Sequence, residues 1–171
     1  IVPGGLRGDL PVGWDAKLRE FLAGIGGELN VLEGLLHENP IWKERTYDIG
    51  VLSVKDALSI GCTGPILRAS GLPLDLRKDA PYSSYEDFDF EIPVGEKGDV
   101  YDRYLVRMVE LRQSARILEQ AIDNLPNDGF RTEDRKIAPP PREELESSME
   151  SLIHHFKLYT EGFRPPVGEA Y

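Results

Sequence analysis

The sequence predicts a mainly α-helical fold, a multihelical bundle with minor β structure that forms an incomplete fragment of a larger whole. Apolar residues recur every three or four positions in three long segments, which is typical of helices that pack along one face. Only one short stretch alternates as a strand would. The 171 residues are enough for one core, so we expect residues 1–171 to be a single domain fragment. Because the chain begins at Ile1 and not at Met, we expect a piece of a longer polypeptide, and a processed terminus is the alternative.

The charge balance narrows the class of partner. The chain has 20 Lys and Arg against 30 Asp and Glu, a net charge of −10, and this excess of acid argues against sequence-independent binding to nucleic acid. The single cysteine, Cys62, forms no internal disulfide and cannot supply a four-cysteine metal site, which favours a reducing compartment. Since no stretch approaches about 18 consecutive apolar residues, we expect no membrane span and no export signal.

Residues 1–13 are expected to form a loop, because prolines and glycines interrupt them repeatedly. Residues 14–38 are expected to be helices, which the glycines at 24, 26 and 27 break into two. The second helix should end near His37, because Pro40 disfavours helical geometry at Asn39. The predicted buried face of this segment consists of Trp14, Leu18, Phe21, Ile25, Leu29, Leu32 and Leu36.

Residues 39–98 are expected to be irregular, with one short helix and one strand. Ser53 and Asp56 form a pair like a capping box at the start of a helix over Val54–Ile60, and Gly61 stands at its expected end. The strand is predicted over Asp87–Ile92, where aromatic or aliphatic residues alternate with acids.

The strongest periodicity predicts a long helix over residues 99–125. Its apolar positions are spaced 4, 3, 4, 3, 4, 3, which is the pattern of a narrow bundle seam. The same spacing predicts a last helix over residues 141–160, whose acidic first turn suits the positive end of the helix dipole. The seam of the long helix consists of Tyr104, Met108, Leu111, Ala115, Leu118, Ile122 and Leu125.

The residues most often found in catalytic or metal sites do not assemble into a motif here. Adjacent His154 and His155 point about 100° apart on a helix and cannot share one ion as an i, i+4 pair does, so a surface or groove role is favoured over metal binding. His37 is expected to cap a helix end, and Cys62 to be a small packed residue. The glycine-rich stretches 4–8 and 61–64 lack the flanking residues of a phosphate loop. We therefore predict no catalytic residue and no metal site.

Arginines and aspartates close to the apolar seams are the more informative feature. Charges in such places are costly unless paired, so we expect buried or interfacial arginine–carboxylate networks that orient neighbouring elements or a partner. A plain solvated surface is the competing interpretation. The residues expected to form these ion pairs are Arg68, Asp75, Arg77, Asp102, Arg103 and Arg107.

Several motifs in order along the chain resemble the D subunit of NADH-quinone oxidoreductase, respiratory complex I. The resemblance covers essentially all of the sequence and corresponds to a central segment of that protein. It is carried by Pro3-Gly4-Gly5 with Asp9-Leu10-Pro11, by Thr63 to Gly71, by Asp75-Leu76-Arg77-Lys78, by Tyr82 to Gly98, by Tyr101 to Arg107, and by Ser148-Met149-Glu150, His155-Phe156-Lys157 and Thr160-Glu161-Gly162.

That family is related to the large subunits of nickel–iron hydrogenases and is multihelical. The resemblance implies a place in the peripheral arm, on the cytoplasmic side of the membrane, against the subunit that carries the terminal iron–sulfur cluster. It also implies that the two subunits together form the quinone pocket, with Pro3, Gly4 and Gly5 in a loop on the cluster side. The segment itself is expected to bind no cofactor and to be inactive alone, while the parent complex holds quinone and the cluster and passes electrons from NADH to quinone, coupled to ion translocation.

Two other classes remain open at this point. A large subunit of a related membrane-bound hydrogenase or coenzyme-dependent dehydrogenase would share the helices, although a single Cys62 cannot hold nickel as cysteine pairs do in hydrogenases. A free-standing helical protein-interaction module would show the same bundle seams.

Overall fold

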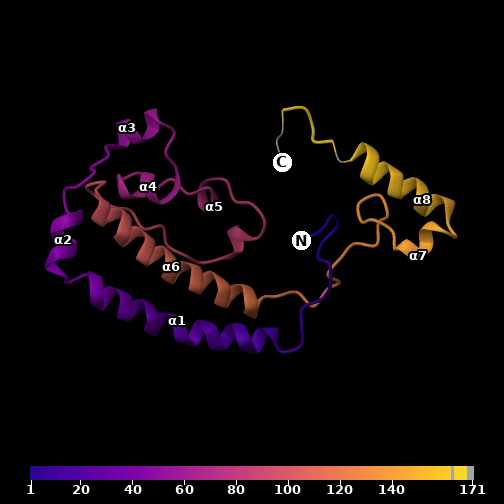
Figure 1. The fold of residues 1–171 in the computed structure, drawn as a ribbon, viewed down its shortest axis with the longest axis horizontal. Coiled ribbons are helices and arrows are strands. Elements are labelled where there is room, and N and C mark those ends of the chain that lie inside the picture. Colours follow the sequence, from indigo (N-terminus) through magenta and orange to yellow (C-terminus); the bar gives the residue numbers. More distant parts are fainter. Residues whose placement is uncertain (163, 169–171) are drawn as a thin grey trace. The chain divides into compact units, whose positions relative to one another are not determined.

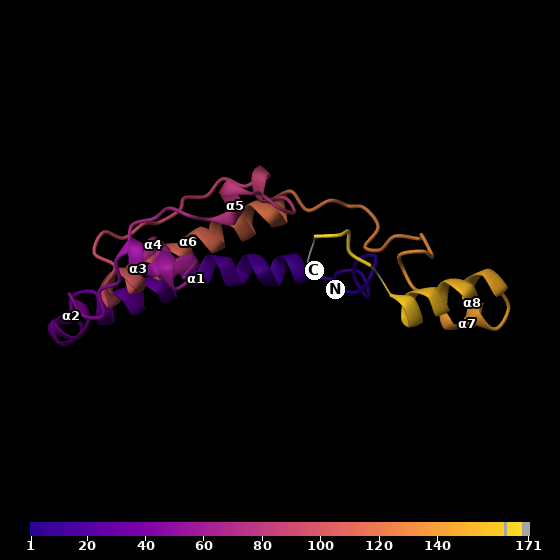
Figure 2. The same cartoon turned by 90° about the horizontal axis from the view of Figure 1, so that it is seen from above.

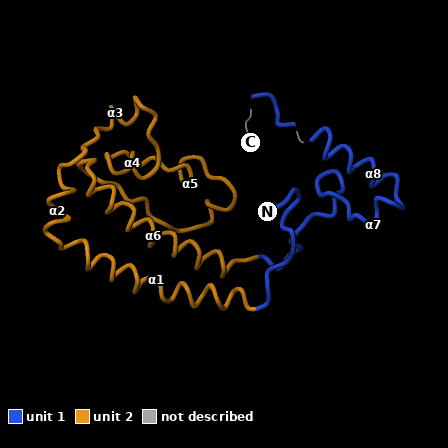
Figure 3. The backbone as a smooth tube through the Cα atoms, viewed as in Figure 1, with its two compact units in different colours: residues 1–12, 126–171 blue, residues 13–125 orange. Residues whose placement is uncertain are grey.

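The computed structural model describes residues 1–162 and 164–168. It confirms a mainly helical fold, and in the described residues β structure is limited to two isolated bridges. The sequence predicted a single domain, whereas the contacts group into two compact units (Figure 3). We call Gly13–Leu125 the central unit, and Ile1–Val12 together with Pro126–Tyr171 the terminal unit.

Two long helices form the frame of the central unit. Helix α1 (Trp14–Leu36) and helix α6 (Val100–Asp123) lie side by side in opposite directions (Figures 1 and 2). Buried leucines of α1 and buried Val106 and Met108 of α6 contribute to the core. Ion pairs join the two helices at two levels, Arg19 with Asp123 (2.8 Å) and Arg112 with Glu33 (2.5 Å).

Helix α1 is continuous where the glycines were expected to break it. A glycine inside a helix costs roughly 1 kcal/mol relative to alanine, and packing against α6 along most of its length offsets that cost. Its buried face is also shifted from the predicted one, because Leu22 is buried while Phe21 and Leu32 are exposed. The seam of α6 divides in a similar way: Met108 is buried, whereas Leu111, Leu118 and Leu125 are exposed.

Four short helices connect α1 to α6, where the sequence predicted one. Each follows a local start signal, and two of them lie within residues 64–79, where the sequence predicted no helix. Prolines stand in the first turns of α2 and α4, and aspartate or serine side chains cap α3 and α5. The helices are α2 (Pro40–Thr46), α3 (Val54–Ser59), α4 (Gly64–Ala69) and α5 (Leu76–Asp79), and a 3-10 turn follows at Tyr85–Asp87.

The strand expected at Asp87–Ile92 is not formed, although its alternation is real, since Phe90 is buried and its acidic neighbours are exposed. Glutamine side chains of α6 take the place of a neighbouring strand. Gln120 accepts from the backbone N–H of Asp89 (2.8 Å) and donates to its carbonyl (2.7 Å), and Gln113 accepts from the N–H of Glu91 (3.0 Å). The extended segment therefore forms its hydrogen bonds with side chains of a helix. The alternation of apolar and acidic residues in its sequence cannot show whether the partner is a strand or a helix.

The terminal unit holds the first loop against the chain after α6. Gly5 forms an antiparallel bridge with Arg131, and the N–H of Thr132 donates to the carbonyl of Gly4 (2.9 Å). The helix predicted over 141–160 is divided, because Ser148 leaves helical geometry and caps a new helix through the N–H of Ser151 (3.3 Å). Its parts are α7 (Arg142–Leu145), α8 (Met149–Phe156) and a π-helical turn, Lys157–Glu161.

The loop before α6 packs so closely that it requires glycine. Gly98 has φ of +70°, and a Cβ there would lie 2.3 Å from the carbonyl oxygen of Leu52. We predict that Gly98→Ala lowers the free energy of unfolding by at least about 2 kcal/mol, because strain and a clash with backbone add together. Urea unfolding followed by circular dichroism measures this change.

Gly26→Ala is the matched control. A Cβ at Gly26 meets nothing within 4 Å, and the residue lies inside α1. This variant should gain roughly 0.5–1 kcal/mol, as alanine does when it replaces glycine in a helix. Equal effects of the two variants would contradict the packing described for the loop.

Candidate functional site

Arg68, at the end of α4, is a buried arginine of the central unit. Its side chain is 8% exposed, and it donates to the Glu110 carboxylate of α6 through Nε (2.9 Å) and through Nη2. Its Nη1 donates to the carbonyl of Leu74 (2.9 Å) and lies 3.5 Å from a carboxylate oxygen of Asp75. One guanidinium group thus ties α4, the segment before α5 and α6 together.

Asp75 lies between two arginines. Its carboxylate accepts from Arg77 Nε (2.9 Å) and Nη2 (2.6 Å), and it also caps α5 through the N–H of Arg77 (3.0 Å). The hydrogen bonds from the Arg77 side chain lower the pKa of Asp75 most; the backbone bond and the charges of Arg77 and Arg68 add to this, and burial opposes it. The Arg77 guanidinium also lies 4.9 Å from the centre of the Phe90 ring, a cation–π contact.

A second polar cluster fixes the loop that leads into α6. Asp99 is fully buried and accepts from the backbone N–H groups of Asp102 (2.8 Å) and Asp48 (2.9 Å). Asp102 in turn accepts from three consecutive N–H groups, those of Glu96 (2.9 Å), Lys97 (2.5 Å) and Gly98 (3.1 Å). The two carboxylates therefore accept hydrogen bonds from the backbone N–H groups around the loop, and these bonds hold the loop in one conformation.

The predicted ion-pair residues are thus only partly brought together. Arg68, Asp75 and Arg77 form one network, while Asp102 bonds to backbone N–H groups. Arg103 donates to the carbonyls of Gly98 (2.7 Å) and Gly50 (2.9 Å), and the exposed Arg107 to the carbonyl of Arg103 (3.0 Å); neither pairs with an acid of the described chain. Sequence reasoning missed Glu110, because its partner lies 42 residues away and no local pattern marks it.

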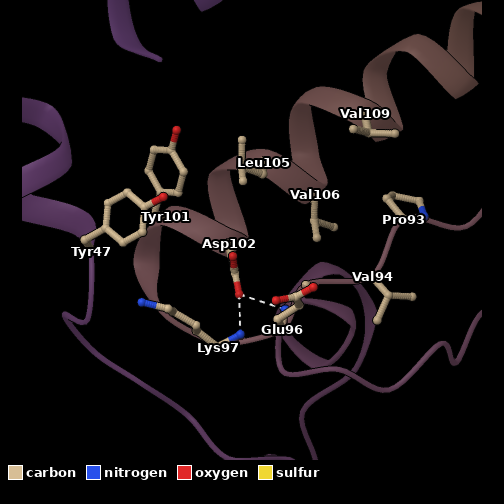
Figure 4. Close-up of a pocket in the computed structure, with 11 residues that line it drawn as sticks. Tyr47, Pro93, Val94, Glu96, Lys97, Tyr101, Asp102, Leu105, Val106 and Val109 are labelled. Atoms are coloured by element: carbon tan, nitrogen blue, oxygen red, sulfur yellow. Dashed lines mark hydrogen bonds between the residues drawn. The ribbon is translucent and has the colours of Figure 1, made fainter. Parts of the chain in front are cut away.

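An open pocket of about 340 Å³ lies beside this loop (Figure 4). One wall is aromatic, with the rings of Tyr47 and Tyr101 stacked 4.5 Å apart, and α6 supplies aliphatic side chains such as Val106. Lys97 Nζ lies 5.1 Å from the centre of the Tyr47 ring and 3.0 Å from the Asp48 carboxylate. Burial raises the pKa of Tyr101 above its ordinary value.

The three histidines make different contacts. His37 was expected to cap a helix end with its imidazole, but its Nδ1 shares a hydrogen bond of 3.0 Å with the Tyr101 hydroxyl. His154 lies 3.6 Å from the Glu150 carboxylate, and His155 packs against Tyr159 with ring centres 4.6 Å apart. Across residues 1–162 and 164–168, no three His, Cys, Asp or Glu side chains gather as a metal site requires. Among the helices of these described residues, none has the length and hydropathy of a membrane-spanning segment.

The loop Pro3-Gly4-Gly5 lies in the terminal unit, where both glycines are required by close packing. A Cβ on Gly4, which has φ of +86°, would lie 2.9 Å from the Cβ of Ala138. A Cβ on Gly5 would lie 2.4 Å from the carbonyl oxygen of Phe130. The loop is therefore a rigid turn whose conformation depends on the segment 130–138.

In both units, then, charged side chains and glycines hold the backbone of a helical framework in place. A family model described as the 49 kDa subunit of respiratory-chain NADH dehydrogenase matches residues 1–171, and the chain belongs to this family.

Curated relatives agree with this assignment. The chain is 56% identical to the NADH-quinone oxidoreductase D subunit of Ehrlichia canis (strain Jake), over all 171 residues and 44% of that relative. It is 52% identical to the D subunit of Wolbachia pipientis subsp. Culex pipiens (strain wPip), again over the whole chain and 44% of the relative. It is 53% identical to the D subunit of Anaplasma marginale (strain St. Maries), over 43% of that protein. The chain thus spans less than half the length of these relatives.

Arg68 allows a direct comparison of a buried and an exposed ion pair. Arg68→Met should lower the free energy of unfolding by about 3–5 kcal/mol, because Glu110 and Asp75 lose a buried cation. The control is Arg116→Met, since Arg116 pairs with Asp89 on an exposed surface, and it should cost about 1 kcal/mol or less. Urea unfolding of both variants provides the test, and equal losses would show that burial of Arg68 adds nothing.

The lowered pKa of Asp75 predicts that the stability of the fold depends on pH. Its pKa in the folded chain is below the unfolded value of about 3.9, so its ionised form stabilises the fold above that pH, and the stabilisation is lost as pH falls through the folded pKa. The wild-type chain should therefore exceed Asp75→Asn in stability by a constant amount near neutral pH, and the difference should shrink below about pH 4. Unfolding curves across this range measure it. A difference that does not change with acidification would contradict the ion pairing.

Proposed function

We propose that this chain is part of the peripheral-arm subunit of an NADH:quinone oxidoreductase and helps to form the quinone-binding region beside the subunit with the terminal iron–sulfur cluster. The observation that carries the proposal is the match of one family model along residues 1–171, together with relatives named as subunits of NADH-quinone oxidoreductase. The whole complex transfers electrons from NADH to quinone and couples this to ion translocation across a membrane, and its peripheral arm lies on the cytoplasmic side of that membrane.

Within that complex the role of the segment is structural. Arg68, Asp75 and Arg77 fix the short helices against α6. The Asp99 and Asp102 carboxylates hold the loop beside the pocket that Tyr47 and Tyr101 line. Elements fixed in this way can present neighbouring loops to other subunits without a large ordering cost. Quinone and the iron–sulfur cluster belong to the parent complex, and no catalytic step is assigned to these residues.

The rigid turn at Pro3-Gly4-Gly5 is proposed to face the cluster-bearing subunit. Its support is physical: two glycines that tolerate no side chain keep the turn in one conformation, as a wall of a reaction pocket requires. A small displacement of such a wall lowers turnover even when the wall performs no chemistry.

The test compares two glycines in the full-length subunit within membranes. Gly4→Ala strains the turn, whereas Gly8→Ala is the control, since a Cβ on Gly8 meets nothing within 4 Å. Gly4→Ala should lower NADH:quinone reductase activity by roughly tenfold or more, and Gly8→Ala should leave it within about twofold. NADH oxidation by a water-soluble ferric acceptor, measured on the same membranes, reports whether the NADH-oxidising part is intact.

Two results would contradict the proposal. One is full quinone reductase activity in Gly4→Ala with the turn displaced. The other is a full-length subunit that purifies without any other protein of an NADH-oxidising complex, which would instead favour a free-standing module. Nickel in the purified full-length protein would point to the related hydrogenases.

A further inference from the structure

Three arginines line one pocket of about 410 Å³ within the terminal unit. They are Arg7 from the first loop and Arg131 and Arg135 from the segment after α6. This concentration of positive charge lies in a chain whose net charge is −10. We call this feature the arginine pocket.

The positive charge of the arginine pocket is only partly neutralised by the described chain. Arg135 pairs with Glu144 of α7 (2.9 Å). Arg131 Nη2 donates to the carbonyl of Pro139 (3.3 Å), but its Nε is buried and finds no acceptor among residues 1–162 and 164–168. Arg7 forms no ion pair or hydrogen bond with any described side chain. Buried donors nearly always have an acceptor, and an anionic group that enters the pocket can supply the one that Arg131 lacks.

The pocket is held in shape before anything binds. The N–H of Leu6 donates to the carbonyl of Phe130 (2.9 Å), and Gly5 bridges to Arg131, which fixes the two arginine-bearing segments side by side. Prolines 139–141 form another wall, and their rings restrict the backbone. A preformed site loses little free energy to ordering when a ligand enters.

The walls also favour a particular kind of ligand. Apart from the arginines, the lining is mostly apolar, with Val2, prolines and Tyr159, and Tyr159 is 68% exposed. Arginine and tyrosine are enriched at protein–protein interfaces, and guanidinium groups bind carboxylates in bidentate geometry. A hydrated free phosphate would leave the apolar walls uncovered, whereas an acidic peptide segment covers them while its carboxylate meets the arginines.

We propose that the arginine pocket binds a carboxylate side chain from an acidic segment of a neighbouring protein chain. Because the chain spans less than half the length of its relatives, another part of the same subunit is the competing occupant, and the cross-linking experiment below distinguishes the two. A second copy of this acidic chain would bring strong like-charge repulsion. This inference rests on the proposed function in one respect, since the neighbour is then another subunit of the complex.

Chemical cross-linking in the assembled complex tests the proposal. Arg7→Lys and Arg131→Lys are introduced separately into the full-length subunit, which keeps each positive charge but supplies an amine. A carbodiimide then joins an amine only to a carboxylate in direct contact, and peptide mass spectrometry identifies the joined residues. Native lysines react in the wild-type complex as well, so only products at position 7 or 131 count. The expected result is a bond from at least one new lysine to Asp or Glu of a different subunit.

Arg116→Lys is the internal control, because Arg116 pairs with Asp89 in the central unit. It should give a bond to Asp89 of the same chain in the same reaction. With that control positive, no product at position 7 or 131 would overturn the proposal. Bonds only to acids of the same subunit, or to a second copy of it, would overturn it equally.

Purification separates this inference from the function on which it rests. If the tagged subunit copurifies with an NADH-oxidising complex but gives no bond to another chain, only the arginine pocket is wrongly assigned. If it copurifies with no such complex, the proposed function fails and the assigned partner fails with it.

Discussion

The central unit depends on one constraint, the burial of the Arg68 guanidinium group between α4 and α6. A charge that is 8% exposed is tolerable only if anions and carbonyls surround it, and Glu110, Asp75 and the Leu74 carbonyl do so from three segments. Because no one of these partners can move away without leaving a buried charge, the short helices must keep their positions along α6. Asp75 also binds Arg77, whose guanidinium group lies over the ring of Phe90, so the same constraint positions these two side chains.

Helix α6 is therefore the element against which the rest of the central unit is aligned. Its first turn anchors the preceding loop through Asp99 and Asp102, its middle holds Arg68 through Glu110, and its glutamines bind the extended segment near Asp89. On its other side it packs against α1. Polar contacts thus fix how the neighbouring elements are aligned along α6. Apolar packing alone specifies this alignment only weakly.

Local signals in the sequence predicted much of this framework, because they act within a few residues. The span of α6, the Ser53 cap and the end of α1 before Pro40 follow from periodicity and from capping chemistry. Features that depend on distant partners could not be predicted: Glu110 meets Arg68 across 42 residues, and glutamines of α6 replace the strand partner of the segment after Tyr85. The family was indicated by ordered motifs, while the arginine pocket arises only when the first loop meets residues 130–141.

A double-mutant cycle between Arg68 and Glu110 tests the central claim most directly. Arg68→Met, Glu110→Leu and the double variant are compared with the parent chain by urea unfolding, and the coupling free energy is taken from the four values. If the buried pair sets the position of α4 on α6, each single change leaves a charged side chain without its main partner and the double change does not, so the coupling should exceed about 1.5 kcal/mol. Additive effects, with a coupling below about 0.5 kcal/mol, would show that apolar packing alone holds these helices together.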